Sequence, residues 1–137
     1  MTGKGERMRI LIVEDDLLGR IILRKLLCSR GDCDTAVNGK EAVEAFRMAW
    51  GENRPYDLIC LDILMPEMDG FEALKAIRGY EEGRGIFGQQ RVKVIMITGK
   101  DDSKSVLTSF REGCEGYVVK PVDRESLQKQ MKEMGLD

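Results

Sequence analysis

Five short apolar runs, each followed by a stretch with helical spacing, constrain the fold of this 137-residue chain more than any other feature. The run Ile10–Val13 is continuously apolar, as expected for a strand of a parallel sheet that is covered on both faces. Strands separated by helices pair in parallel, and right-handed crossovers place the helices on both faces. The sequence therefore predicts an α/β fold with an open, doubly wound, five-stranded parallel sheet. The predicted strands are 10–13, 34–37, 58–61, 92–97 and 117–119, and the predicted helices are 18–29, 40–50, 71–78, 103–112 and 124–134.

Length and composition favour a single domain over residues 1–137, with its core at about 8–134. The chain is 42% hydrophobic and 34% charged, which is typical of a folded domain. Its 22 basic and 24 acidic residues give a net charge of −2, which argues against direct binding of nucleic acid. We find no secretory leader and no apolar run near the ~18 residues that span a bilayer, so we expect a cytoplasmic protein that does not bind membranes.

The histidine and cysteine content excludes several kinds of chemistry. The chain has no histidine, so Ser–His and Cys–His catalysis and His-ligated zinc are excluded. Its four cysteines form no Cys-x-x-Cys pair, which leaves zinc ribbons and thioredoxin-type chemistry without support. We interpret them as free structural thiols, and we expect Cys114, beside Gly113, to be the most exposed.

Reactive residue types follow four of the five predicted strands. They are Glu14 and Asp15 after the first, Asp62 after the third, Thr98 after the fourth and Lys120 after the fifth. Ligands of open α/β sheets bind beyond the carboxyl ends of the strands, so we expect these side chains to converge. Three carboxylates repel one another unless a hard cation such as Mg²⁺ binds, and an ammonium group suits a phosphoryl oxygen. A carboxylate that remains free could attack phosphorus and form an acyl phosphate.

These strand-end motifs resemble those of receiver domains of two-component response regulators, in the style of the single-domain chemotaxis regulator. The resemblance runs from about Met8 to Met134 and implies the flavodoxin-like strand order 2-1-3-4-5. The matching motifs, in chain order, are residues 10–16, 57–70, 97–99 and 117–121.

The resemblance implies a role for each acid. Asp62 corresponds to the phosphoacceptor and to a metal ligand, Asp15 to the direct Mg²⁺ ligand, and Glu14 to an acid that holds the metal through water. The backbone carbonyl of Leu64 corresponds to a further ligand. Mn²⁺ could substitute for Mg²⁺. We interpret Asp16 and Asp69 separately, as residues that cap helices.

The resemblance also implies a switch. Thr98 and Lys120 correspond to residues that contact phosphoryl oxygens, and Thr98 and Tyr117 to the pair that responds to phosphorylation. The Lys120–Pro121 bond corresponds to one that is cis in the family. Phosphorylation would then remodel the surface formed by the fourth helix, fifth strand and last helix.

Two features are individual to this chain. In the family, the positions of Leu64 and Lys100 flank the route of the water that hydrolyses the acyl phosphate. An apolar Leu64 side chain cannot orient that water, so we hypothesise slow self-dephosphorylation. The sequence also predicts an extended, mobile loop over 79–90, longer than most such connections. Family members in phosphorelays and hybrid kinases often have this length.

The resulting prediction is a signalling switch that is not a metabolic enzyme. Its phosphodonor would be a histidine kinase or a histidine phosphotransfer protein, and its output would be a downstream protein effector that it binds as a monomer or as a phosphorylation-linked dimer. Alternatives are a phosphorelay intermediate, a receiver fragment of a larger regulator or hybrid kinase, and a phosphate-independent scaffold. A dehalogenase-type phosphohydrolase would need a second Asp where Leu64 stands, and a flavin binder would need a glycine- or hydroxyl-rich loop instead of acids after the first strand.

Overall fold

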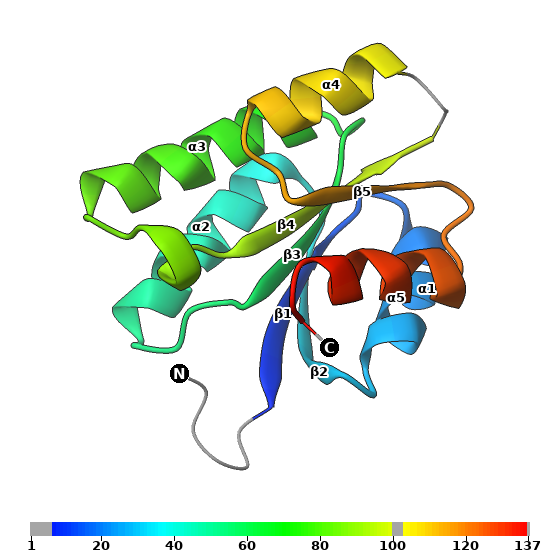
Figure 1. The fold of residues 1–137 in the computed structure, drawn as a ribbon, viewed down its shortest axis with the longest axis horizontal. Coiled ribbons are helices and arrows are strands. Elements are labelled where there is room, and N and C mark those ends of the chain that lie inside the picture. Colours follow the sequence, from blue (N-terminus) through cyan, green and yellow to red (C-terminus); the bar gives the residue numbers. More distant parts are fainter. Residues whose placement is uncertain (1–6, 100–102, 137) are drawn as a thin grey trace.

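The computed structural model describes residues 7–99 and 103–136 and contains the predicted α/β sandwich (Figure 1). All strands of its five-stranded sheet are parallel, in the order β2-β1-β3-β4-β5, which confirms the predicted topology. The strands are β1 (Met8–Val13), β2 (Gly31–Ala36), β3 (Leu58–Asp62), β4 (Lys93–Thr98) and β5 (Gly116–Val119). The helices are α1 (Leu17–Leu27), α2 (Gly39–Gly51), α3 (Gly70–Gly83), α4 (Ser103–Arg111) and α5 (Arg124–Glu133), with a short 3₁₀ helix at Gly88–Gln90.

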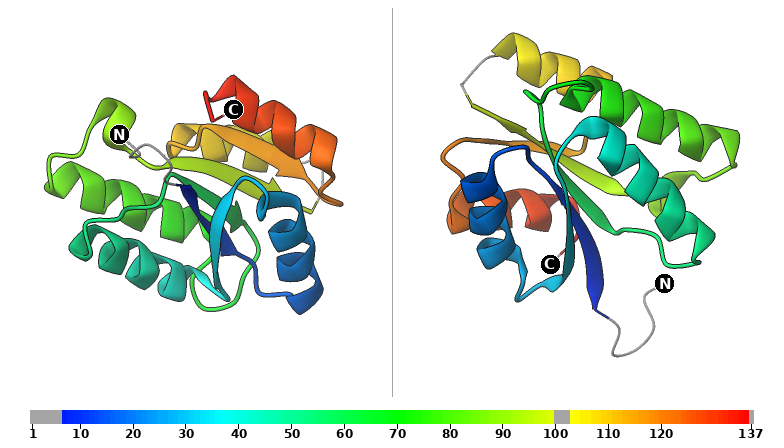
Figure 2. Two further views of the ribbon diagram at one scale, coloured as in Figure 1. Left: turned by 90° about the horizontal axis from the view of Figure 1, so that it is seen from below. Right: turned by 180° about the vertical axis from the view of Figure 1, so that it is seen from behind.

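The sheet separates two hydrophobic clusters, because successive strand residues point to opposite faces. Helices α1 and α5 cover one face, and α2 and α3 cover the other, with α4 beside α3 and the edge strand β5 (Figures 1 and 2). Ile10 and Ile12 of β1 belong to the cluster under α1 and α5, whereas Leu11 and Val13 belong to the cluster under α2 and α3. The central strands are therefore apolar on both faces, as the continuous apolar runs predicted.

Four helices begin at a side chain that caps the first turn. The carboxylates of Asp16, Asp69 and Asp123 and the amide oxygen of Asn38 each accept a hydrogen bond from a backbone N–H three residues later. Such caps satisfy amide groups that have no partner inside the helix. The predicted capping roles of Asp16 and Asp69 are confirmed. Because these caps lie just after β1, β2 and β3 and just before α5, they hold the loops at the carboxyl edge of the sheet.

Two predicted boundaries were wrong. Strand β2 begins at Gly31 instead of residue 34, because its whole length pairs with β1 although its sequence is largely polar, as an edge strand allows. Helix α3 continues to Gly83, so the first part of the predicted 79–90 loop is helical. Buried Glu81 explains this extension: its carboxylate pairs with Arg78 at 2.7 Å and accepts the Val92 N–H at 2.8 Å, which attaches the helix end to the start of β4.

All four cysteines are free thiols, but the expectation for Cys114 was wrong. Cys114 is buried in the cluster under α2 and α3, and burial raises the pKa of its thiol to about 11. The exposed thiol belongs to Cys28, which ends α1. A glycine neighbour therefore did not indicate exposure, since the turn at Gly113 points the next side chain inward. In the part of the chain that the structure describes, no helix is long and apolar enough to cross a membrane.

Candidate functional site

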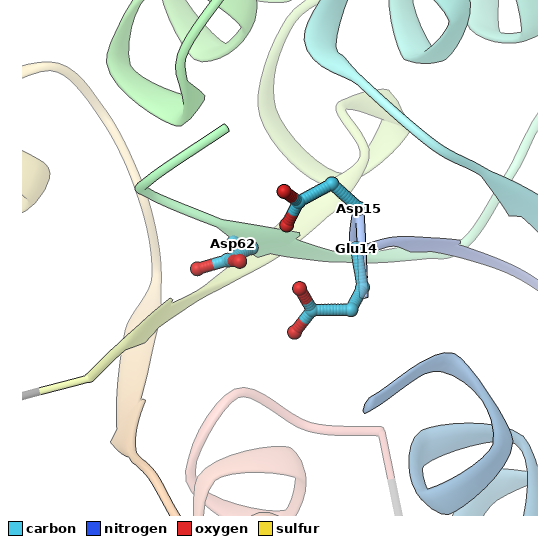
Figure 3. Close-up of side chains that lie close together, drawn as sticks. All are labelled: Glu14, Asp15 and Asp62. Carbon is cyan, nitrogen blue, oxygen red and sulfur yellow. The ribbon is translucent and has the colours of Figure 1, made fainter. Parts of the chain in front are cut away.

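Three carboxylates meet beyond the carboxyl ends of β1 and β3 (Figure 3). The register of these strands pairs Val13 with Leu61, so the residues that follow them, Glu14 and Asp62, emerge side by side. Glu14, Asp15 and Asp62 each offer an oxygen, and these oxygens lie within 4.8 Å of one another. Adjacent parallel strands thus bring together acids that are separated by 47 or more positions in the sequence.

The side chain of Lys120, which directly follows the edge strand β5, contacts these acids. Its Nζ lies 3.0 Å from Glu14 Oε1 and 3.2 Å from Asp62 Oδ2. The backbone N–H of Lys120 donates to the Thr98 carbonyl at 2.8 Å, which extends the pairing of β4 and β5 beyond the end of β5. The Lys120–Pro121 peptide bond is cis. One ammonium group therefore bridges two of the three acids.

Burial and crowding raise the pKa values of two acids. Glu14 is 1% exposed, and its pKa is raised by burial and by the neighbouring Asp62 carboxyl. The pKa of Asp15 is raised by partial burial and by Glu14, although its side chain is exposed. Burial lowers the pKa of Lys120, but its contacts with Glu14 and Asp62 outweigh this effect and leave the pKa above its ordinary value. The site thus carries more negative charge than its single lysine neutralises.

This donor set fits a hard divalent cation. Carboxylate oxygens are the ligands that Mg²⁺ prefers in proteins, and Mg²⁺ usually retains several waters beside one or two carboxylates. Asp15, which is exposed, and Asp62, which is 3% exposed, lie at the opening and the floor of the cluster. Leu64 lies two residues beyond Asp62, with its side chain 76% exposed.

The two residues of the predicted switch lie on neighbouring strands. Thr98 ends β4 and is 6% exposed, one position beyond Ile97, which pairs with Asp62. Tyr117 on β5 is half-buried, and its ring meets Phe110 of α4 edge to face, with the centroids 6.0 Å apart. Lys100 lies outside the described residues. The fold therefore places Thr98 between the acid cluster and the strand that carries Tyr117.

Sequence reasoning missed the surface of α1 beside the acids. Ile22 has apolar helical spacing with Leu23, Leu26 and Leu27 in the predicted helix 18–29, yet it is 41% exposed. It forms an exposed apolar face together with Leu17, Leu18 and Ile21. A cavity of about 380 Å³ separates this helix from Pro121 and Val122 and is bordered by Glu14 and Lys120. The signal was present in the sequence, because a helix with more apolar residues than one buried stripe needs must expose some of them.

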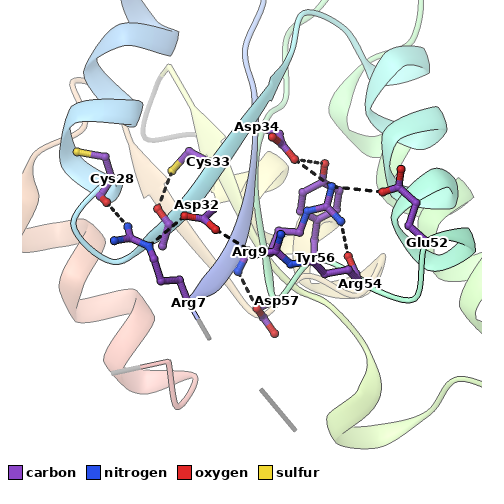
Figure 4. Close-up of polar contacts among 11 residues, drawn as sticks. Arg7, Arg9, Cys28, Asp32, Cys33, Asp34, Glu52, Arg54, Tyr56 and Asp57 are labelled. Atoms are coloured by element: carbon purple, nitrogen blue, oxygen red, sulfur yellow. Dashed lines mark hydrogen bonds and ion pairs between the residues drawn. The ribbon is translucent and has the colours of Figure 1, made fainter. Parts of the chain in front are cut away.

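A second polar cluster occupies the opposite edge of the sheet (Figure 4). Arg7 and Arg54 both pair with Asp32 at 3.0 Å, and Arg9 pairs with Asp34 at 3.3 Å. These pairs are partly exposed, so each contributes about 1 kcal/mol or less to stability. The three arginines, each paired with a carboxylate, border a cavity of about 620 Å³ that Arg91 and Lys93 also line. This cluster connects β1, β2 and the segment that precedes β3.

The comparisons with known proteins identify the family. The family model of the response regulator receiver domain matches residues 10–132, so the chain belongs to this family of two-component signalling proteins, whose members are regulatory switches. The chain is 32% identical over 126 residues to the chemotaxis protein CheY of Treponema pallidum (strain Nichols), which covers 90% of the chain and 79% of that protein. It spans only 6% to 54% of the length of other relatives, which include hybrid histidine kinases and transcriptional regulators.

Solved structures show the same fold. The CheX–CheY–BeF₃–Mg²⁺ complex from Borrelia burgdorferi superposes with a TM-score of 0.81 and 28% identity, covering 95% of this chain and 90% of that chain. The receiver domain of Ssk1 in its co-crystal with the histidine phosphotransfer protein Ypd1, from Saccharomyces cerevisiae, gives a TM-score of 0.81 and 31% identity with the same coverage. The acid cluster of this chain and the Mg²⁺ in a structural neighbour both support magnesium binding.

Proposed function

We propose that this chain is a phosphorylation-activated switch that accepts a phosphoryl group on Asp62. The observation that carries the proposal is the bridging contact of Lys120, whose Nζ lies 3.2 Å from Asp62 and 3.0 Å from Glu14. This contact places an ammonium group beside a carboxylate that has two more acids for neighbours. Positioning and charge neutralisation are the main requirements of phosphoryl transfer, and these residues provide both.

The chemical step is an attack by an Asp62 oxygen on the phosphorus of a phosphohistidine. A P–O bond forms and the P–N bond breaks, and the electron pair of that bond stays on the imidazole nitrogen of the donor. Asp15, Asp62 and the Leu64 carbonyl would hold Mg²⁺, with Glu14 acting through water, and the bound ion would neutralise charge on the phosphoryl oxygens. Mn²⁺, which prefers the same oxygen ligands, can replace it.

The acyl phosphate acts as the ligand that shifts the switch. Lys120 pairs with a phosphoryl oxygen, and the Thr98 hydroxyl donates to another. Movement of Thr98 leaves space for the ring of Tyr117, which ends its edge-to-face contact with Phe110 of α4. The surface formed by α4, β5 and α5 then binds a downstream protein effector, as a monomer or as a phosphorylation-linked dimer.

The donor is a histidine kinase or a histidine phosphotransfer protein. The exposed apolar face of α1, formed by Leu17, Leu18, Ile21 and Ile22, lies beside the acids and supports a protein donor. The structural similarity to Ssk1 in complex with a phosphotransfer protein supports the same class of partner. We place the chain in the cytoplasm, where such donors act, as one receiver domain over 1–137 with its core at about 8–134.

Return to the resting state occurs by hydrolysis. Water attacks phosphorus, the acyl P–O bond breaks, and the Asp62 carboxylate and inorganic phosphate are released. The Leu64 side chain is 76% exposed and has no group that could orient this water, which favours a long-lived acyl phosphate and a role as a phosphorelay intermediate. Leu64→Asn should therefore accelerate decay several-fold relative to wild type, measured as loss of phosphorylated protein over time after donor removal, and an unchanged half-life would refute this role for Leu64.

Phosphorylation by a small acyl-phosphate donor with Mg²⁺, followed by intact-mass measurement, tests the proposed function. We expect the mass of one added phosphoryl group on the wild-type protein and none on Asp62→Asn. Asp16→Asn is the matched control, because Asp16 is an acid of the same loop whose capping role asparagine can replace. An unmodified wild type would favour the phosphate-independent scaffold, and an adduct that persists in Asp62→Asn would exclude this phosphoacceptor.

A further inference from the structure

Arg20 of α1 holds the backbone on both sides of Asp15. Its Nη1 donates to the Glu14 carbonyl at 2.8 Å and to the Asp15 carbonyl at 3.0 Å. These carbonyls belong to the two peptide planes that flank the Asp15 Cα atom. Because peptide planes are rigid, only the φ and ψ angles of Asp15 join them. A single guanidinium nitrogen that holds both planes therefore sets the direction in which the Asp15 side chain leaves the backbone.

The neighbouring acids have other restraints, and Asp15 depends more on its backbone. The Glu14 side chain is buried and contacts Lys120, and the Glu14 N–H donates to the Ala36 carbonyl of β2 at 3.1 Å. The Asp15 side chain is exposed. Across residues 7–99 and 103–136, no carboxylate lies within 4.0 Å of the Arg20 guanidinium, so its donors serve backbone carbonyls instead of an ion pair.

We propose that Arg20 is a positioning residue for the divalent cation that binds at Asp15. The inference rests on the proposed function, since it assumes that this cluster binds Mg²⁺. Groups that orient metal ligands without touching the metal commonly change affinity 10- to 100-fold when they are removed. Here the group acts on the backbone of the ligand, and its effect reaches the metal through the direction of one Cα–Cβ bond.

The sign of the effect separates positioning from electrostatics. Arg20 carries a positive charge close to a cation site, so its charge by itself weakens cation binding, and removal of that charge should strengthen it. Loss of positioning has the opposite effect, because Asp15 would sample directions that do not face the metal. A variant that lacks the guanidinium group therefore binds Mg²⁺ more weakly only if positioning dominates.

The test is a Mg²⁺ titration of the whole protein, followed by amide resonances in NMR spectra, for wild type, Arg20→Gln, Arg20→Lys and Arg24→Gln. Arg24 lies one turn later on α1 and is exposed, so Arg24→Gln removes the same charge without affecting the loop that carries Glu14 and Asp15. We expect Arg20→Gln to weaken Mg²⁺ binding about tenfold and Arg20→Lys to weaken it less. We expect the control to stay within about twofold of wild type. In the metal-free protein, amide hydrogen exchange at 15 and 16 should be faster in Arg20→Gln.

Each outcome decides the question. Unchanged or tighter Mg²⁺ binding by Arg20→Gln, with wild-type exchange at 15 and 16, would overturn the positioning role while leaving the proposed function intact. If Arg20→Gln does not fold, Arg20→Met decides, because it keeps an apolar stem but has no donor for the two carbonyls; wild-type affinity in that variant overturns the inference. Absence of Mg²⁺ binding by wild type, or binding that survives Asp15→Asn, would instead refute the metal site of the proposed function.

Discussion

Replacing Asp62 by asparagine should stabilise the metal-free protein, because it removes one of three crowded negative charges. The oxygens of Glu14 and Asp15 lie within 4.8 Å of an Asp62 oxygen. At an effective dielectric constant of about 20, two unit charges at this separation repel by about 3.5 kcal/mol. Asparagine removes two such repulsions and also loses the attraction of Lys120, about 5 kcal/mol on the same scale. The balance of about 2 kcal/mol falls to about 1 kcal/mol because Asp15 and Lys120 are partly exposed to water.

Urea unfolding in EDTA at neutral pH measures this difference. We expect a higher midpoint for Asp62→Asn at an unchanged dependence on urea concentration. Saturating Mg²⁺ should remove the advantage, since a ligand that binds only the folded state stabilises wild type by mass action. Low pH should also reduce the advantage. Glu14 and Asp15 have raised pKa values in the folded state, so the wild type loses stability as pH rises from their ordinary values of 4.5 and 3.8 through the raised values.

Asp57→Asn is the matched control for this measurement. Asp57 precedes β3 at its amino end and accepts the Arg9 N–H at 2.8 Å, a bond that an asparagine oxygen can also accept. The control should therefore show no stabilisation. The electrostatic reasoning would be refuted if Asp62→Asn were no more stable than wild type in EDTA, or if its gain did not change between neutral and acidic pH.

Three further predictions test the site and the core. Mg²⁺ affinity should fall as pH decreases from 7, and the fall should begin at a higher pH than for an ordinary carboxylate. Protons compete with the metal, and burial and a neighbouring carboxyl raise the pKa of Glu14. Calorimetry at several pH values measures this dependence. Gly70→Ala should destabilise the protein by more than about 1 kcal/mol, since the new Cβ would lie 2.4 Å from the carbonyl oxygen at the end of β3. A Cβ at Gly79 of the same helix would meet no atom within 4 Å, so Gly79→Ala should stabilise the protein by about 0.5–1 kcal/mol. Thermal melts distinguish the two variants. Maleimide labelling of the native protein should modify Cys28, which is exposed, and not Cys60, which is buried with a pKa raised to about 12; equal labelling of both thiols would contradict the described packing.

The periodicity of the sequence was sufficient to predict the layers of the fold and the position of the acids. Continuous apolar runs such as Ile10–Val13 occur where a strand is covered on both faces, and this pattern depends on few long-range details. Because parallel strands end at one edge of the sheet, residues that follow different strands must meet there. The strand order itself came from the family resemblance. The roles of Asp62 and its neighbours in phosphoryl transfer stay predictions until they are measured.

Tertiary contacts decided features that have no local signal. Polar β2 is a strand because the exposed edge of β1 pairs with it, and α3 is long because Glu81 has a partner on another element. The burial of Cys114 depends on which face of the sheet the neighbouring helices cover.

The arrangement of the acid loop shows the same division. The sequence alone predicted that Glu14 and Asp15 follow a strand, because the pattern of apolar residues that indicates a strand is a local property. The carbonyl contacts of Arg20 and the bridge from Lys120 were not predicted, because a side chain's partner is set by the relative position of whole elements after they pack.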